Sequence, residues 1–263
     1  MLLTTFIIPL IISSIGFKRC MYFISLGYSL SIAVIGLYLL IITNINLALN
    51  ELFIGLLYII YGLRLFYFLY NRMFKSQSYN KKMRDEISKS DSINLTVKFF
   101  IWISCAFLYC TQSSPLTFRI LSANKNNDKL TYIGIIIMIC GLILEIWADR
   151  QKDKSKKINP NRFVDTGLYR IVRCPNYLGE TIFWTGNFFG GIGIYDGIFQ
   201  WFFSLLGYVI IVYVMFSGAR RLEIRQNKDY GNDISYKKYT KTIPILIPFI
   251  PLYSLEKYTW LKG

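Results

Sequence analysis

The sequence contains no histidine among its 263 residues. This absence excludes Ser-His-Asp triads, histidine-based acid–base catalysis and most zinc sites. The five cysteines show no Cys-x-x-Cys spacing, and four of them lie in apolar runs, where cysteine is usually a small buried hydrophobe. No Gly-x-Gly-x-x-Gly motif follows a strand pattern, so a soluble Rossmann site is not expected either. No metal site is predicted.

Acidic residues are scarce, with 15 Asp and Glu against 30 Lys and Arg, which gives a formal net charge of +15. A basic chain of this kind is typical of the positive-inside bias of membrane proteins and of contact with anionic headgroups. The other explanation for this excess of basic residues is that they bind a phosphorylated cofactor. Nucleic acid is not expected as a partner, because no basic face interleaved with exposed aromatics is visible.

Long polar stretches are few, since 54% of the residues are hydrophobic and the mean hydropathy is +0.39. Apolar runs of about 20 residues, the length that crosses a bilayer, recur along the chain. The first run ends at Lys18-Arg19 without a small-residue cleavage site, so it is predicted to be a span and not a signal peptide. We expect an all-α, polytopic membrane protein, one integral membrane domain over 1–263. Its seven predicted transmembrane helices are 2–17, 21–43, 48–70, 95–114, 130–148, 177–195 and 199–217.

The distribution of Lys and Arg orients these spans. Threading them alternately places Lys18 and Arg19, the loops 71–94 and 149–176, and the tail 218–263 on one side, with 25 of the 30 basic residues. The loops on the other side contain only Arg119, Lys125 and Lys129. The C-terminal tail is therefore predicted to be cytoplasmic and the N-terminus to lie outside. A bacterial plasma membrane and a eukaryotic endoplasmic reticulum fit equally well.

The stretch 167–180, GLYRIVRCPNYLGE, is the predicted functional centre, because it combines cations, a Pro-Asn helix break and a carboxylate at the mouth of a membrane segment. Arginine binds phosphate bidentately, while Asp, Asn and Glu can hydrogen-bond ribose hydroxyls or an amide. This mixture favours a nucleotide with several phosphates over a lipid headgroup. The predicted cofactor-binding set is Glu145, Asp149, Lys156, Arg162, Arg170, Arg173, Asn176, Tyr177, Glu180, Arg220 and Arg221.

Two further features lie outside this centre. Arg64 is deep in the third span and shares a helix face with Tyr61, so it either snorkels to the surface or faces an internal cavity. Tyr236 and Tyr239 in the tail could stack on a planar ring or belong to an interfacial aromatic belt. The prolines after them prevent further helix, and the neighbouring Ile, Leu and Phe indicate that the tail folds back onto the membrane face.

Several segments in order resemble one family. They are YGLRLFYFLYNR, KFFIWISCAFLYCTQSSPL, LEIWADRQKDKSKK, NRFVDTGLYRIVRCPNYLGE and YGNDISYKKYTKTIPILIP, within 61–251. The chain resembles the uncharacterised membrane-protein family, DUF1295, that is related to the C-terminal domain of steroid 5-alpha-reductases. The wider superfamily includes sterol reductases and isoprenylcysteine carboxyl methyltransferases.

This resemblance implies a seven-helix membrane domain that holds NADPH in its C-terminal helices. The implied reaction is reduction of a carbon–carbon double bond in a lipid-soluble enone or sterol-like substrate taken from the surrounding membrane lipids. Carried over by position, Asp149, Lys156, Arg162, Asn176 and Glu180 would belong to the cofactor site, with Arg220 or Arg221 beside them. Tyr61 and Arg64 would be catalytic. The tyrosine would stabilise or protonate the developing enolate, and Arg64 would assist it or help to hold the cofactor.

The chain departs from this pattern at two points. Relatives usually read RHPNY where this chain has Cys174, and the membrane glutamate that pairs with the tyrosine in steroid reductases has no clear counterpart. Two other functions therefore stay open. One is an S-adenosylmethionine-dependent methyltransferase of the isoprenylcysteine type, in which Glu223 would match a late glutamate. The other is a non-enzymatic lipid-binding protein that keeps the fold.

Overall fold

The computed structural model describes residues 1–43, 47–75, 92–122 and 129–261. These residues are predominantly α-helical and contain no strand, which confirms the predicted all-α class. In hydrocarbon a helix satisfies its own backbone hydrogen bonds, so apolar runs of this length favour helices. Lys125 and most of the basic loop 71–94, on which the predicted orientation partly depends, lie outside the described residues.

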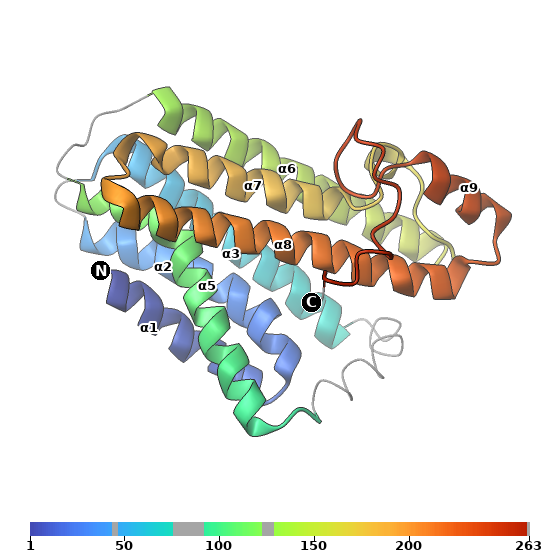
Figure 1. The fold of residues 1–263 in the computed structure, drawn as a ribbon, viewed down its shortest axis with the longest axis horizontal. Helices are drawn as coiled ribbons and strands as arrows, with labels where there is room; N and C mark the ends of the chain where they lie inside the picture. Colours follow the sequence, from blue (N-terminus) through green and yellow to red (C-terminus); the bar gives the residue numbers. More distant parts are fainter. Residues whose placement is uncertain (44–46, 76–91, 123–128, 262–263) are drawn as a thin grey trace. The chain divides into compact units, whose positions relative to one another are not determined.

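Residue contacts divide the chain into two compact units. Unit 1 comprises Met1–Ile135 and Asn187–Tyr208, and unit 2 comprises Ile136–Gly186 and Val209–Gly263. The helices, labelled in Figure 1, are α1 (Leu2–Ser13), α2 (Tyr28–Ile42), α3 (Leu49–Lys75), α5 (Leu95–Leu121), α6 (Lys129–Ile158), α7 (Pro175–Gly191), α8 (Gly197–Tyr230) and α9 (Ile234–Thr242). Helices α6, α7 and α8 each have residues in both units.

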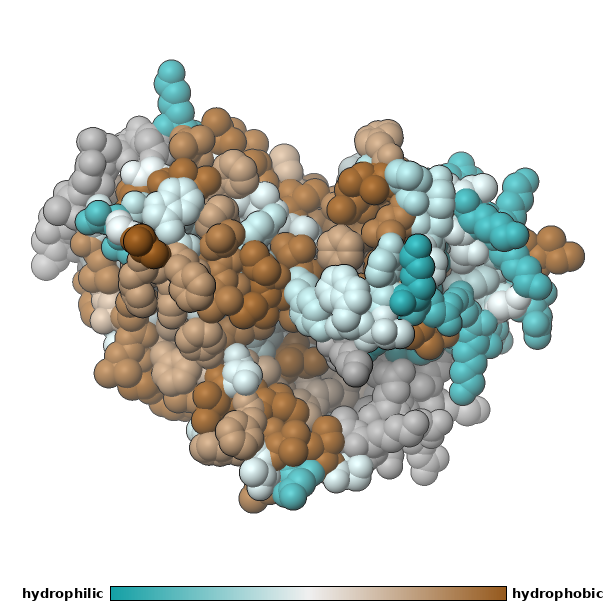
Figure 2. All heavy atoms as spheres, in the orientation of Figure 1, coloured by the Kyte–Doolittle hydropathy of each residue, from teal (hydrophilic) through white to brown (hydrophobic). Residues whose placement is uncertain are grey.

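Five helical stretches of the described residues are long and apolar enough to cross a membrane: Cys20–Ile42, Leu49–Lys75, Leu95–Leu121, Lys129–Ile158 and Gly197–Tyr230. The predicted spans 2–17 and 177–195 correspond to a shorter apolar helix, Leu2–Phe17, and to the 17-residue α7. The face drawn in Figure 2 is hydrophobic over the helices and hydrophilic around α9. The chain thus has the helices of an integral membrane protein, with five candidate spans.

In unit 1, α2 packs against α3, and α1 packs against α5. Glycines allow the close approach of α2 and α3, as small residues commonly do between membrane helices. A Cβ atom at Gly62 would lie 2.4 Å from the backbone oxygen of Ser29, and one at Gly36 would lie 2.9 Å from that of Gly55.

Arg119 in unit 1 corrects the sequence prediction, which put it in a loop. It lies in the last turns of α5 and is buried. Its Nε and Nη2 donate hydrogen bonds of 3.1 and 2.8 Å to the backbone oxygen of Gly190, at the end of α7. A helix C-terminus leaves carbonyls without intrahelical donors, so this guanidinium replaces the missing partners.

In unit 2, α6 and α7 cross closely at two glycines. A Cβ atom at Gly141 would lie 2.4 Å from the amide nitrogen of Phe183, and one at Gly179 would lie 2.7 Å from that of Glu145. The side chain of Tyr177 on α7 lies against Gly218 of α8. Figure 1 shows these three helices running alongside one another.

The C-terminal tail folds into unit 2. The amides of Arg173 and Cys174 donate hydrogen bonds of 2.9 Å each to the backbone oxygens of Pro244 and Ile245. One apolar cluster joins the tail to Cys174, just before α7, and to Ala219 of α8. The tail contributes Ile245, Leu246, Leu255 and Leu261. The apolar tail residues thus form part of a protein core.

Candidate functional site

The predicted site residues fall into both units. All eleven predicted cofactor-binding residues lie in unit 2, whereas Tyr61 and Arg64 lie in unit 1. The eleven predicted cofactor-binding residues come from α6, the loop 159–174, α7 and α8.

The crossing of α6 and α7 gathers the acceptor groups. Glu145 and Asp149 are buried on α6, and Glu180 is buried on α7 immediately after the contact glycine Gly179. Asn176, in the first turn of α7, is half-buried. Within the described chain its Oδ1 is buried and accepts no hydrogen bond. The crossing therefore presents an unused amide oxygen in the same helix as Glu180.

Lys156 and Arg162 hold the loop that precedes α7. The Lys156 ammonium donates hydrogen bonds to the backbone oxygens of Pro160 (3.3 Å) and Arg162, and to the Tyr230 hydroxyl (3.0 Å). The Arg162 guanidinium forms an ion pair of 2.7 Å with Asp165. Both cations thus have structural partners in addition to any role toward a phosphate.

Arg173 and Glu223 form a buried ion pair. Nη2 of Arg173 lies 2.8 Å from Oε1 of Glu223 and also donates to the backbone oxygen of Tyr253. Oε2 of Glu223 accepts a bond of 2.7 Å from the Leu255 amide. The pair thus joins the segment before α7, helix α8 and the tail. In the described part of the chain, Nε and Nη1 of Arg173 are buried and have no acceptor.

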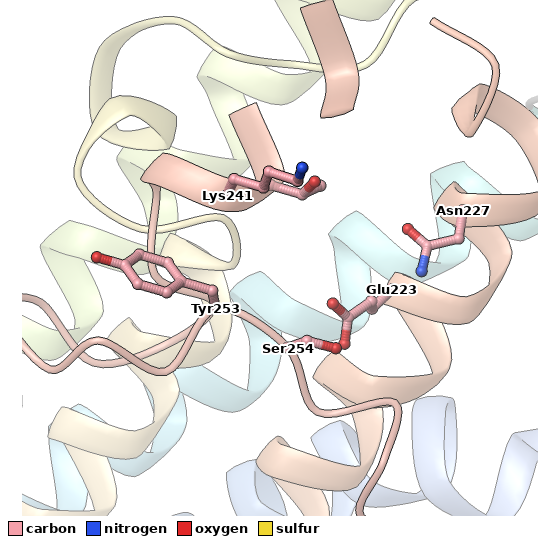
Figure 3. Close-up of a pocket in the computed structure, with 6 residues that line it drawn as sticks. Glu223, Asn227, Lys241, Tyr253 and Ser254 are labelled. Carbon is pink, nitrogen blue, oxygen red and sulfur yellow. The ribbon is translucent and has the colours of Figure 1, made fainter. Parts of the chain in front are cut away.

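A pocket of about 290 Å³ opens beside this pair. Figure 3 shows Glu223 and Asn227 extending from α8, Lys241 from α9, and Tyr253 and Ser254 from the tail. Its volume is at the lower end of ligand pockets, which suits one polar group of a larger molecule. Except for Glu223, these residues were missed, because they come from segments that only the folding of the tail brings together.

The remaining predicted cations, Arg170, Arg220 and Arg221, differ in whether they bond to the protein or are exposed. Arg220 donates to the backbone oxygens of Glu256 and Leu261, at 3.2 to 3.5 Å, and so fixes the tail. Arg170 and Arg221 are exposed. Arg162 is exposed as well but is paired with Asp165, so Arg170 and Arg221 are the exposed predicted cations without an ion pair among the described residues.

Cys174, at the position where the family resemblance predicts histidine, packs in the apolar cluster of the tail. Burial raises the pKa of its thiol to about 12. A neutral, buried thiol there has a packing role, and the loop keeps its shape through the backbone bonds to the tail.

Tyr236 and Tyr239 form hydrogen bonds and ring contacts inside unit 2. The Tyr236 hydroxyl donates to Oδ1 of Asn227 (2.8 Å), and that of Tyr239 donates to the backbone oxygen of Tyr169 (2.8 Å). Both rings pack against Phe163, with centroids 5.2 Å apart in each case. These contacts explain the two tyrosines without a ligand or a membrane interface.

In unit 1, Tyr61 is fully buried on α3, and Arg64 follows it one turn later, half-buried. The hydroxyls of Tyr61 and Tyr28 lie 2.9 Å apart and share a hydrogen bond. Tyr28 follows a π-helical turn, Phe23–Gly27, a deviation that often occurs at functional sites. Sequence reasoning did not find Tyr28, since nothing local distinguishes it from other tyrosines of the apolar runs.

These features define an all-helical membrane protein with a basic, acceptor-rich unit and a buried tyrosine pair. The chain belongs to the family described as "Protein of unknown function (DUF1295)", whose model matches residues 16–243. It is also similar to the steroid 5-alpha-reductase DET2 of Arabidopsis thaliana, with 39% identity over 56 residues. That match spans 20% of this chain and 21% of the plant protein. No solved structure matches the chain significantly.

Proposed function

We propose that this protein is a membrane-embedded, NADPH-dependent reductase of a carbon–carbon double bond in a lipid-soluble enone or sterol-like substrate. The predicted cofactor-binding residues would hold NADPH, and Tyr61 would act on the substrate. The name of the plant relative, a steroid 5-alpha-reductase, supports this reaction class.

The observation that carries the proposal is the gathering of all eleven predicted cofactor residues in unit 2. The chemistry of this set fits a phosphorylated dinucleotide. Arg170 and Arg221 are exposed cations for phosphate, and Arg173 keeps two buried donors without acceptors among the described residues. Oδ1 of Asn176, which accepts no hydrogen bond from the described residues, and the carboxylates of Glu145 and Glu180 can accept hydrogen bonds from ribose hydroxyls or an amide.

In the proposed reaction, bound NADPH would supply the hydride that adds to the β carbon of the enone. The Tyr61 hydroxyl would donate a hydrogen bond to the carbonyl oxygen, where negative charge develops. A proton from solvent water would add at the α carbon and complete the reduction, with the cofactor left as NADP⁺. The 2.9 Å hydrogen bond between the Tyr28 and Tyr61 hydroxyls would hold the Tyr61 hydroxyl in place, and Arg64 would add positive charge one turn away.

The methyltransferase alternative shares the helical membrane fold and has Glu223 at a pocket. In this structure the Glu223 carboxylate pairs with the Arg173 guanidinium and accepts a hydrogen bond from the Leu255 amide. S-adenosylmethionine carries a carboxylate but no phosphate, so it would leave the exposed cations Arg170 and Arg221 without a phosphate to bind.

The proposal is tested by cofactor binding to purified protein in detergent, comparing NADPH, NADH and S-adenosylmethionine by calorimetry. The wild type is expected to bind NADPH selectively. Asn176→Leu removes the free acceptor and Arg170→Ala removes an exposed cation, and each is expected to weaken NADPH binding about tenfold.

The matched control is Lys257→Ala, which removes one exposed positive charge from the tail and is expected to leave NADPH binding unchanged. Binding of S-adenosylmethionine in place of NADPH would overturn the reductase in favour of methyl transfer. Absence of any nucleotide binding would favour the non-enzymatic lipid-binding protein.

A further inference from the structure

Unit 1 contains a two-layer cluster of buried polar side chains. Tyr58 and Tyr61 are three residues apart on α3, as are Tyr109 and Gln112 on α5, so each pair spans one helix turn. The first layer is Tyr28, Tyr61 and Tyr109, and the second is Tyr58, Gln112 and Asn187. Three residues of helix correspond to ~4.5 Å along the axis, so the two layers are neighbours.

The first layer is hydrogen-bonded and packed. The Tyr28 and Tyr61 hydroxyls are 2.9 Å apart, and the ring of Tyr28 lies 5.1 Å from that of Tyr109. The Tyr109 hydroxyl donates a bond of 2.7 Å to the backbone oxygen of Phe23, in the π-helical turn. This layer contains the predicted catalytic hydroxyl.

The second layer is joined through a backbone oxygen. The Tyr58 hydroxyl donates to Oδ1 of Asn187 (2.6 Å), and Nδ2 of Asn187 donates to the backbone oxygen of Gln112 (2.9 Å). Tyr58 also approaches that oxygen at 3.4 Å. Both bonds to Gln112 are accepted by its backbone oxygen, and neither involves its side chain.

The carboxamide of Gln112 differs from its neighbours. Gln112 is 2% exposed, yet among the described residues neither Oε1 nor Nε2 has a hydrogen-bond partner. The adjacent buried hydroxyls all have acceptors: Ser113 donates to Cys110 at 3.0 Å, Ser114 to Thr111 at 2.7 Å, and Thr117 to Ser113 at 3.1 Å. Buried polar atoms without partners are costly and rare, so this amide requires an explanation other than packing.

We propose that Gln112 recognises a hydroxyl group on the lipid-soluble substrate. A hydroxyl both donates and accepts, so it can satisfy Oε1 or Nε2 in a site closed to water, which a plain hydrocarbon cannot. The substrate class is thus a hydroxylated, otherwise apolar enone, whose carbonyl is taken by Tyr61 in the neighbouring layer. This inference rests on the proposed function for the enone, and on the structure alone for the hydroxyl.

The test uses androst-4-en-3-one and its 6β-, 11β- and 17β-hydroxy derivatives, which share one enone and differ by a single hydroxyl. Binding to protein in lipid nanodiscs is measured by equilibrium dialysis, with empty nanodiscs subtracted. The wild type is expected to bind at least one hydroxy derivative about tenfold more tightly than the parent ketone. Gln112→Met, of similar volume and apolar, is expected to abolish that preference and to retain binding of the parent ketone.

A second readout separates recognition from structure. Because the Gln112 amide has no hydrogen-bond partner among the described residues, Gln112→Met is expected to raise the thermal midpoint of the protein. Ser114→Ala is the matched control on the same helix, since its hydroxyl also bonds that of Ser204 at 2.9 Å. That variant is expected to lower the midpoint and to keep the hydroxyl preference.

The inference is overturned if the wild type binds no probe, if it does not distinguish the derivatives, or if Gln112→Met keeps the preference. It is also overturned if Gln112→Met melts below the wild type. If the wild type prefers a hydroxy derivative but does not bind NADPH, the proposed reductase activity is rejected and the proposed role of Gln112 is retained.

Discussion

Single buried side chains of unit 2 hold together segments that are distant in the sequence. The Arg173–Glu223 pair is 2.8 Å long, and Cys174, the next residue, packs beside the tail residues Ile245 and Leu246. A buried ion pair is costly unless its other hydrogen bonds are made, and the Leu255 amide and the Tyr253 oxygen supply some of them. The thiol of Cys174 adds a dependence on pH.

Unit 2 should therefore lose stability in alkaline solution. Burial raises the pKa of Cys174 to about 12 from an unfolded value near 9, so its neutral form favours the fold fully below pH 9. That contribution is lost as the pH rises from about 9 to about 12. We expect the thermal midpoint of the wild type to fall over this range and that of Cys174→Ala to fall less, measured by differential scanning fluorimetry.

Cys140→Ala provides the control, because Cys140 is exposed, and its profile should match that of the wild type. Parallel profiles for wild type and Cys174→Ala would show that the thiol does not contribute.

At the scale of elements, the crossing of α6 and α7 positions the carboxylates of the candidate cofactor site. Gly141 and Gly179 let the two backbones touch, and Glu145 and Glu180 lie beside that contact. Helices α8 and α9 contribute Glu223, Asn227 and Lys241 to the pocket in Figure 3. The site thus depends on helix spacing as well as on its polar residues.

Adding one methyl group at the crossing should separate the helices. In Gly141→Ala the new Cβ would lie 2.4 Å from the amide nitrogen of Phe183, so the backbones must move apart. We expect a loss of about 1–3 kcal/mol of stability and weaker NADPH binding, because Glu145 moves with α6. Thermal melts and calorimetry measure the two effects.

Gly218→Ala is the matched substitution on α8, where the nearest atom of Tyr177 is 3.4 Å from the new Cβ. It should be neutral or stabilising by up to about 1 kcal/mol, since alanine is the better helix former. Equal melting of the two alanine variants would contradict the role given to the crossing.

At the scale of the whole molecule, the distribution of basic residues predicts the orientation of the protein in the membrane. Five stretches qualify as spans, and α1 and α7 are shorter helices. The clustering of basic residues after α6 and in the tail favours a cytoplasmic location for both segments.

Reporter fusions in a bacterial host test this orientation. Green fluorescent protein fused after residue 75 or at the C-terminus should fluoresce, because it folds in the cytoplasm. Alkaline phosphatase fused after residue 122 should be active, because that connection is predicted to lie outside. An active phosphatase at the C-terminus would reverse the predicted topology.

Hydropathy along the chain was enough to predict the all-α class and the regions of the apolar helices, whereas the family was predicted from the resemblance of several sequence segments. These properties are local, because each apolar run meets the length and backbone requirements of a membrane helix by itself. The sequence also selected the residues that gather in unit 2, through the types of side chain around the Pro-Asn break.

Only the tertiary structure decided how those residues are used. It pairs Arg173 with Glu223, commits Arg220 to the tail, buries Arg119 under the end of α7 and brings Tyr28 to Tyr61. It also shows Gln112 as a buried amide without a partner among the described residues. Such pairings join residues tens of positions apart, and they follow from close packing of side chains, which no periodicity or motif along the chain encodes.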